Sequence, residues 1–264
     1  MKELSGSQVD KLGRRLRNAK TPSLEDLRLL ERVRRTYEDA RLEVVQTLLA
    51  EGLEGTSRLK TTSTIIEKLR RESTMHLSRM QDIAGVRLVI DGGRLGQDRV
   101  VERICGLFPD ERTVDRREKP SYGYRAVHVI VRTRGCLVEV QVRTYLQDMW
   151  AQVVERLADL YGRQIRYGEP PTNPDVEIAA GWTRRALVGL FMPWSNEVDR
   201  VETAAALLAE LERRAETSAD AAARLAGMSE LRARLDHAER QLRNALEPLH
   251  AALQPAVDDV GGQA

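Results

Sequence analysis

Four short stretches of the chain carry polar residues whose types and spacing could do chemistry. In "LVEVQVRT" (137–144), three valines alternate with Glu139, Gln141 and Arg143. A strand places alternate side chains on opposite faces, so these polar groups share one face, with Glu139 and Gln141 about 6.6 Å apart along it. The pattern predicts a carboxylate, an amide and a guanidinium aligned on an otherwise apolar strand. A solvated polar face is the alternative interpretation.

A second stretch, "RLKTTSTIIEK" (58–68), concentrates cations where a helix is expected to begin. The free N–H groups of a helix N-terminus and the helix dipole both favour negative charge. Flanking cations strengthen such a site, so this stretch predicts an anion site or, alternatively, a solvated basic face. Its candidate residues are Arg58, Lys60, Ser63 and Lys68.

A third stretch, "DIAGVRLVI" (82–90), places Asp82 at the entrance of an apolar strand that Arg87 interrupts. A half-buried aspartate needs a partner, because an unpaired charge is costly away from water. That partner is either a structural arginine or a divalent cation, and the sequence leaves both open.

The fourth stretch, "KPSYGYRAVH" (119–128), has two tyrosines on either side of a glycine, followed by Arg125 and His128. A tyrosine such as Tyr124 on a glycine-containing loop can stack on a base, with an arginine beside it for phosphate. A turn that packs its aromatic rings at the sheet edge, followed by a structural histidine, is the alternative.

Together the four stretches supply two acids, several cations of the kind that bind phosphate and a stacking tyrosine. Magnesium-dependent transfer of a phosphate group to a nucleotide hydroxyl needs this set of groups. One acid holds the metal, the cations neutralise the phosphate chain, and the second acid ligates the metal or takes the proton.

The elements that position these residues follow from the period of the apolar pattern. Apolar residues at three- and four-residue steps, beginning after a capping Ser23, predict a helix over 23–50. Runs rich in β-branched residues predict strands, the last two joined as a hairpin through Arg134, Gly135 and Cys136. Arg58 and Lys60 are expected in the loop that enters the second helix. The order predicts an α+β fold, a mixed β-sheet flanked by helices. The further expected ranges are helices at 61–72, 97–108 and 145–161, and strands at 83–90, 126–133 and 137–144.

The proline-rich stretch "GEPPTNPD" (168–175) is the best candidate for a domain boundary. The predicted organisation is an N-terminal segment (1–22), a main domain (23–168), a helical C-terminal extension (169–258) and a flexible tail (259–264). Within the extension, 175–192 is predicted to be helical as far as Pro193, and Pro248 and Pro255 are expected to limit the final helix.

An apolar seam in the extension suggests self-association. The residues that keep its 3-4 spacing are Met228, Leu231, Leu235, Ala238, Leu242 and Ala245. The seam covers about two and a half heptads, too few for a long coiled coil. We therefore predict helices that pack on the domain or on a second copy of the chain, as a homo-oligomer, or that bind an inhibitory protein.

The amino-acid composition limits the classes of protein to which the chain can belong. Among 264 residues, 42% are hydrophobic, 31% are charged and the net charge is +2, so a core is expected and the chain is not a polycation. Cys105 and Cys136 form no CxxC pair and are expected to be reduced thiols. The first residues contain no apolar leader and no long apolar run occurs, so we expect a protein with no membrane contact, located in the cytoplasm.

The four stretches, in the same order, resemble the synthetase domain of the RelA/SpoT family, which makes the alarmone (p)ppGpp. "RLKTTSTIIEKLRR", "DIAGVRLVI", "YGYRAVHVIV" and "VEVQVRTYLQDMWAQ" carry the resemblance over about residues 40–168. The size resembles that of the small alarmone synthetases, some of which are toxins paired with an antitoxin. The resemblance implies a nucleotidyltransferase-like mixed sheet. It also implies transfer of the β,γ-pyrophosphate of an ATP donor, with Mg²⁺, to the 3′-hydroxyl of a GDP or GTP acceptor.

The resemblance also implies a role for each candidate residue. Asp82 and Glu139 would be the catalytic and metal-binding acids. The residues that would bind ATP are Arg58, Lys60, Ser63, Lys68 and Arg87. The residues that would bind the acceptor nucleotide are Tyr124, Arg125, His128, Gln141 and Arg143.

One departure concerns the acceptor. Many family members have Pro-Lys before the Gly-Tyr, whereas this chain reads "KPSYGY". An alternative acceptor is the 3′ CCA end of tRNA, which some toxic family members pyrophosphorylate. Such an enzyme needs an additional basic surface, although scattered solvated arginines are the simpler interpretation. An inactive nucleotide-binding regulatory module is a further alternative. The candidate arginines for a tRNA surface are Arg112, Arg116, Arg117, Arg163 and Arg166.

Overall fold

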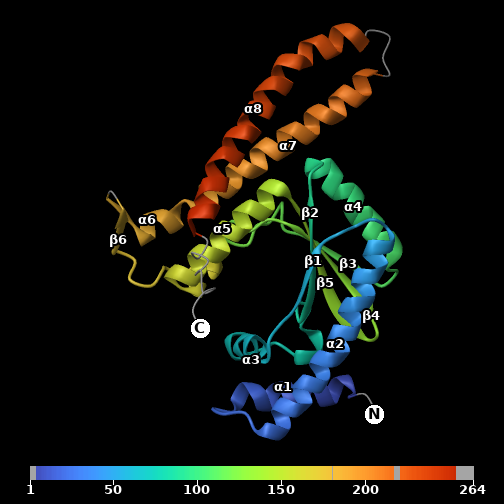
Figure 1. Ribbon diagram of the computed structural model, residues 1–264, viewed down its shortest axis with the longest axis vertical. Coiled ribbons are helices and arrows are strands. Elements are labelled where there is room, and N and C mark those ends of the chain that lie inside the picture. Colours follow the sequence, from blue (N-terminus) through green and yellow to red (C-terminus); the bar gives the residue numbers. More distant parts are fainter. Residues whose placement is uncertain (1–3, 180, 217–220, 254–264) are drawn as a thin grey trace, which may run out of the picture. The chain divides into compact units, whose positions relative to one another are not determined.

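A computed structural model describes residues 4–179, 181–216 and 221–253, and Figure 1 shows its elements. The predicted tail at 259–264 and the region around Pro255 lie outside these described residues. The helices are α1 (Gly6–Asn18), α2 (Leu24–Ala50), α3 (Thr62–Arg71), α4 (Gly93–Leu107), α5 (Tyr145–Tyr161), α6 (Arg184–Gly189), α7 (Phe191–Glu216) and α8 (Ala221–Leu253), with short 3₁₀ helices η1 (Leu77–Arg79) and η2 (Arg163–Tyr167). The strands are β1 (Thr56–Leu59), β2 (Ala84–Ile90), β3 (Arg112–Asp115), β4 (Val127–Thr133), β5 (Cys136–Thr144), β6 (Glu177–Ala179) and β7 (Trp182–Thr183).

The chain divides into two compact units, each built from separate stretches of sequence. The first unit comprises residues 1–89, 99–114 and 127–142, and the second comprises 90–98, 115–126 and 143–264. The first unit contains most of the sheet, and the second contains α5 and the C-terminal helices. The predicted domain boundaries remain predictions.

The first unit is built on a five-stranded sheet with the strand order β1-β2-β5-β4-β3. β4 and β5 form the predicted antiparallel hairpin, whose two-residue turn, Arg134 and Gly135, has positive φ at both positions. The valines at 138, 140 and 142 are fully buried, whereas Glu139 and Gln141 between them stay partly exposed. The predicted alternation along β5 and the mixed sheet flanked by helices are therefore confirmed.

Helices α1, α2 and α3 pack against one another within the first unit. α2 contacts β1 and β4, and Ser23 caps it by accepting the backbone N–H of Asp26, as predicted. α1 was not predicted, although Ser5 and Gln8 form a capping box and Leu12 and Leu16 are buried. Val9, Leu12 and Leu16 recur at helical spacing between polar residues, so the sequence carried a signal for this helix that the prediction missed.

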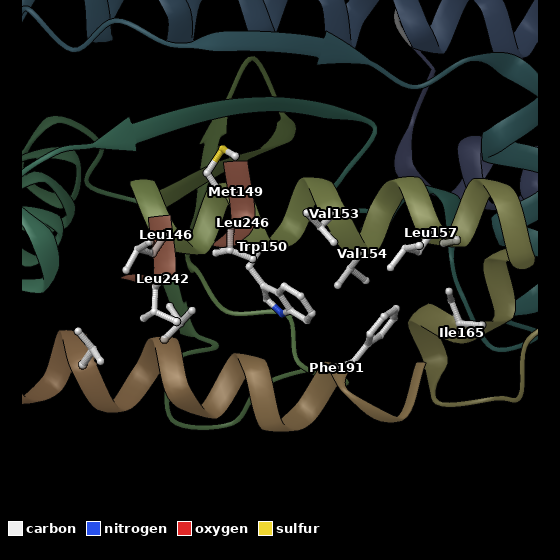
Figure 2. Close-up of a cluster of buried hydrophobic side chains, with 13 residues drawn as sticks. Leu146, Met149, Trp150, Val153, Val154, Leu157, Ile165, Phe191, Leu242 and Leu246 are labelled. Atoms are coloured by element: carbon white, nitrogen blue, oxygen red, sulfur yellow. The ribbon is translucent and has the colours of Figure 1, made fainter. Parts of the chain in front are cut away.

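The second unit has its own apolar core between α5, α7 and α8. Figure 2 shows side chains of α5, including Trp150 and Val154, pointing toward Phe191 of α7, with Leu242 and Leu246 of α8 beside them. Trp150 meets Phe191 edge to face, with ring centroids 5.7 Å apart. Two members of the predicted oligomer seam, Leu242 and Ala238, thus lie in or against an intrachain core, while Leu231 is exposed. Self-association remains a prediction.

Two predictions in the C-terminal region are wrong. Residues 175–192 form the β6/β7 hairpin and the short α6 rather than one helix, and Gly181, with φ of 81°, lies in its turn. Pro193 lies in the first turn of α7, where its missing N–H costs no helical bond. Pro248 does not limit the last helix, since α8 continues to Leu253 and packs against α5 on both sides of the proline.

Smaller differences concern element boundaries. Arg58 lies on β1 rather than in a loop, and α4 begins at Gly93, four residues earlier than predicted. β1 and β3 have four residues each and are mostly exposed, so neither gives an alternating signal. Cys105 and Cys136 are free thiols, as expected. Across the described ranges, no helix is long and apolar enough to cross a membrane.

Candidate active site

Asp82 is held by two lysines just before β2. Lys68 Nζ donates a hydrogen bond to Asp82 Oδ2 at 2.9 Å, and Lys60 Nζ lies 3.4 Å from the same oxygen. The other oxygen, Oδ1, is buried and has no hydrogen-bond partner among the described residues. The protein groups paired with Asp82 are thus two lysine ammonium groups rather than the arginine that was considered, and the divalent cation remains a prediction.

The two lysines are positioned by the backbone around the start of α3. The Lys60 N–H donates to Ile83 O at 2.7 Å, and Lys60 O accepts from Arg34 Nε at 2.9 Å. Thr61 caps α3 by accepting the Thr64 N–H. Lys68 follows in the last turn of this short helix, which places both ammonium groups at one carboxylate.

Two other predicted residues near this helix are more exposed. Ser63 lies in the first turn of α3, where its hydroxyl is 2.9 Å from the Thr61 hydroxyl. Arg58 is exposed on β1 and lies opposite Gly85 of β2 in the register. Arg87 is half-buried on β2 and pairs in register with Thr56. These placements leave the predicted ATP contacts of Ser63, Arg58 and Arg87 as predictions.

Glu139 lies on β5 between two hydrogen-bonding neighbours. His128 Nδ1 lies 3.0 Å from Glu139 Oε1, and Gln141 Nε2 donates to Oε2 at 2.6 Å. The hairpin register produces this arrangement, because His128 of β4 lies directly opposite Gln141 of β5. Paired residues in an antiparallel ladder share a face, so all three side chains meet on the same side of the sheet.

The pKa of Glu139 is lowered to about 2 by these neighbours. Burial opposes ionisation, but the hydrogen bond and charge of His128, the hydrogen bond from Gln141 and the charge of Lys68 together outweigh it. Lys68 therefore acts on both acids, through a direct contact with Asp82 and through its charge on Glu139. The structure brings together six of the predicted residues: Lys60, Lys68, Asp82, His128, Glu139 and Gln141.

The donor set on this face fits a hard divalent cation. Mg²⁺ is usually bound by one or two carboxylates together with water and substrate phosphates. Asp82 Oδ1 is a buried carboxylate oxygen with no other hydrogen-bond partner among the described residues, which is what such a ligand requires. Glu139 uses both oxygens in hydrogen bonds but keeps further lone pairs. The described part of the chain contains no cluster of three or more His, Cys, Asp or Glu side chains that could hold a metal without substrate.

The predicted loop with Tyr124 is a tight turn in the second unit. Ser121 and Tyr124 exchange two backbone hydrogen bonds, and the residues between them, Tyr122 and Gly123, have φ of 51° and 87°. Arg143 Nη2 donates to the Tyr124 hydroxyl at 3.1 Å, and its guanidinium carbon lies 5.0 Å from the ring centroid. The ring that was predicted to stack on a base is thus held by an arginine.

The two arginines predicted to bind the acceptor are buried. Arg143 is 1% exposed and donates to Asp148 at 2.9 Å. Arg125 is 6% exposed and donates to Ser195 of α7 at 2.9 Å. Both guanidiniums bind protein groups in this structure, so their acceptor roles remain predictions. Nothing in the sequence indicates that Ser195 binds Arg125, because the two residues lie 70 positions apart along the chain.

Three of the five arginines considered for a tRNA surface are paired with acids. Arg117 binds Asp98 and Asp115, both at 2.7 Å or less. Arg163 and Arg166 lie 3.8 and 3.4 Å from the same Asp159 oxygen. Their charges are thus partly neutralised within the chain.

Comparison with known proteins agrees with this geometry. The family described as "Region found in RelA / SpoT proteins" matches residues 57–161. The predicted resemblance of this region to the synthetase domain of the RelA/SpoT family is confirmed. Every residue predicted for the site lies within the matched region, and so do both acids that the structure places beside Lys68.

Two curated relatives share this region. An uncharacterized protein of Mycobacterium tuberculosis is 44% identical over 128 residues, which cover 48% of this chain and 45% of that protein. The GTP pyrophosphokinase YjbM of Bacillus subtilis is 32% identical over 123 residues, covering 42% of this chain and 58% of YjbM. The chain thus matches about half of the length of these relatives.

Two solved structures share the fold. Small alarmone synthetase 1 of Bacillus subtilis, bound to its product pppGpp, has a TM-score of 0.51 at 22% identity, covering 67% of this chain and 94% of that one. Another structure of the same enzyme has a TM-score of 0.50 at 24% identity, covering 72% and 98%. The predicted nucleotidyltransferase-like fold of the RelA/SpoT domain is confirmed.

Proposed function

We propose that the chain is an ATP-dependent pyrophosphotransferase that makes (p)ppGpp. The 3′-hydroxyl oxygen of GDP or GTP attacks the β-phosphorus of ATP. The bond between this phosphorus and the α,β-bridging oxygen breaks, AMP leaves with that oxygen, and the hydroxyl proton passes to a base. The product carries the β,γ-pyrophosphate on its 3′-oxygen.

The observation that carries this proposal is the group formed by Asp82, Lys68 and Glu139. Two acids and a cation on one sheet face supply what phosphoryl chemistry requires, namely ligands for a metal and neutralisation of the phosphate chain. Lys68 Nζ lies 2.9 Å from Asp82 Oδ2. Because a triphosphate is a stronger anion than one carboxylate, we expect Lys60 and Lys68 to turn toward the donor phosphates when ATP binds.

Glu139 acts in this proposal as a permanent negative charge. A carboxylate with a pKa of about 2 is ionised at every physiological pH and is a weak proton acceptor, since a general base works best near pKa 7. Its charge can ligate a cation and orient His128. An ionised carboxylate only accepts hydrogen bonds, so His128 Nδ1 is the donor in its hydrogen bond with Glu139 Oε1. We assign proton acceptance to the Glu139–His128 pair as a unit.

Mg²⁺ bound by Asp82 and Glu139 would neutralise charge that develops on the transferred phosphates. The chain's own contribution is to keep the two acids ionised and in place. The lysines do this for Asp82, and His128 and Gln141 do it for Glu139.

The relatives support the same reaction. YjbM is named as a GTP pyrophosphokinase, and small alarmone synthetase 1 of Bacillus subtilis, which has the same fold, binds pppGpp as its product. Because "KPSYGY" departs from the family pattern at the acceptor loop, the test offers tRNA as an acceptor beside GDP and GTP. We also propose that the protein acts in the cytoplasm.

The test supplies purified protein with Mg²⁺ and ATP labelled in the β or γ phosphate. GDP, GTP and deacylated tRNA are offered in separate reactions. We expect label on the guanosine nucleotides and release of AMP. Label on tRNA alone would assign the alternative acceptor, and no transfer to any of the three would contradict a pyrophosphotransferase.

A further inference from the structure

Residues near the start of α7 bind the side chain of Arg125, which follows Tyr124. Arg125 Nε donates to Ser195 Oγ at 2.9 Å, and Nη2 donates to Asn196 Oδ1 at 2.8 Å. The third nitrogen, Nη1, lies 3.2 Å from Asp199 Oδ1. These three side-chain partners all lie on α7, and Nη1 also donates to the Arg117 carbonyl oxygen just before the turn. A planar guanidinium with several fixed acceptors has one position and one orientation.

The backbone of the Ser121–Tyr124 turn also packs closely against α5 and α7. A Cβ added to Gly123 would lie 3.0 Å from Phe191 O at the start of α7 and 3.5 Å from the Ser195 Cβ. On another side, Trp150 Nε1 of α5 donates to Gly123 O at 3.1 Å. Gly123 also has a φ of 87°, which favours glycine. The turn thus fits between α5 and α7 with no room for a side chain at this position.

Loss of a hydrogen bond between Arg125 and α7 is costly because these groups are buried. Ser195 is fully buried and Arg125 is 6% exposed. A buried charge that loses one partner is left partly unsatisfied, so the surrounding chain shifts rather than tolerating the loss. Because Arg125 directly follows Tyr124, any shift of its guanidinium moves the turn that carries the predicted acceptor-binding ring.

We propose that Ser195, Asn196 and Asp199 are positioning residues for the acceptor nucleotide. They act through Arg125, which sets the place of the Ser121–Tyr124 turn, and none of them is expected to touch a substrate. The C-terminal helix α7 is then part of acceptor recognition in addition to being a packing element. This inference rests on the proposed function, since it assigns α7 to one of its two substrates.

The variants that test it are S195A and N196A, which each remove one acceptor from Arg125. N196D is the conservative partner, because it keeps the Oδ1 acceptor and the shape. E197Q is the control, since Glu197 lies in the same helical turn and pairs with Arg200 at the surface. Asn196 is exposed, so N196A is expected to fold even if S195A is destabilised.

Steady-state kinetics with GDP and ATP varied separately gives the decisive comparison. S195A and N196A are expected to raise the KM for GDP about tenfold while the KM for ATP stays within about twofold. N196D and E197Q should stay within about threefold of wild type for both substrates. An equal rise in both KM values, a change confined to kcat, an unchanged KM for GDP or an N196D variant as impaired as N196A would overturn the proposal.

Amide hydrogen exchange separates this proposal from the proposed function, because it needs no activity. Exchange of residues 116–126 should accelerate about tenfold in N196A, with no change in α2 and no change in E197Q. If the wild-type protein transfers no pyrophosphate, the proposed function fails. The exchange result then decides alone, and unchanged exchange in the turn would show that α7 does not position it.

Discussion

The polar face of the sheet and the turn at residues 121–124 use charged residues in opposite ways. On the sheet face, Lys60, Lys68 and Asp82 remain between 18% and 25% exposed and satisfy one another. Around the turn, the side chains of Arg125 and Arg143 are 7% and 2% exposed and are bonded to protein groups. Charges that neutralise each other at an accessible surface can exchange partners when a ligand arrives. Buried charges with several protein partners cannot do so without disturbing the fold.

This difference assigns two kinds of role to residues of similar type. The cations of the sheet face are available to a phosphate chain, whereas the arginines of the turn hold its shape. Substitutions of Lys60, Lys68 and Asp82 should therefore remove activity and spare stability. Substitutions around the turn should lower stability or alter one substrate's KM.

The largest effect is expected for D82N on the sheet face. Asparagine keeps the shape but removes the charge that Lys60 and Lys68 neutralise, so kcat for pyrophosphate transfer should fall about 10³-fold. The melting temperature should change little, because the site stays partly exposed. D159N removes a carboxylate that is half-exposed, and it should stay within about twofold of wild type. If D82N has the kcat of wild type, Asp82 is not part of the active site.

R143M should show the opposite behaviour. Methionine leaves Asp148 and the Tyr124 hydroxyl without their buried donor, so the free energy of unfolding should fall by about 3–4 kcal/mol. Urea denaturation measures this loss. R200Q, at a side chain that is 73% exposed, should change stability by less than about 0.5 kcal/mol. If R143M is as stable as R200Q, the turn does not depend on its buried charges.

The free energy of unfolding should fall at acid pH because Glu139 becomes protonated. The folded-state pKa of about 2 lies below the ordinary value of 4.5, so the stabilisation is present above pH 4.5 and is lost as the pH falls toward 2. The difference between the pKa of Glu139 in the unfolded and the folded protein corresponds to about 3 kcal/mol of folding stability. Urea denaturation of wild type and E139Q from pH 6 to pH 2 should show wild type losing this much more stability. Parallel curves would mean that His128, Gln141 and Lys68 do not stabilise the carboxylate.

K68Q tests whether one cation serves both acids. Loss of its charge should raise the pKa of Glu139 and leave Asp82 with Lys60, so kcat/KM for ATP should fall about 30-fold. R71Q is the matched control in the same helix, since Arg71 pairs with the neighbouring Glu72 and is 45% exposed. Equal activities for the two variants would exclude Lys68 from the donor site.

The sequence predicted the sheet face well because its signal is local. Alternation in β5 placed Glu139 and Gln141 on one side, and the hairpin brought His128 opposite Gln141. The pairing of Asp82 with two lysines was not predicted. It depends on the return of the chain from β1 through α3 to β2, which residue spacing does not encode.

The turn was predicted less completely because its partners are distant in sequence. A loop with aromatic residues was expected, but nothing around Tyr124 indicates that Ser195 and Asn196 hold the next residue. The wrong helix at 175–192 and the misplaced stop at Pro248 have a related cause. Both came from local propensity, and packing of α7 and α8 on α5 overrides it.

The most direct test of the central claim compares wild type and E139Q in transfer of label from ATP. Glutamine retains the shape of the side chain, so the comparison isolates the charge of Glu139. With saturating ATP, GDP and Mg²⁺, wild type should place label on the guanosine nucleotide, and E139Q should do so about 10³-fold more slowly. Transfer by E139Q at the wild-type rate would contradict the claim that this sheet face performs the chemistry.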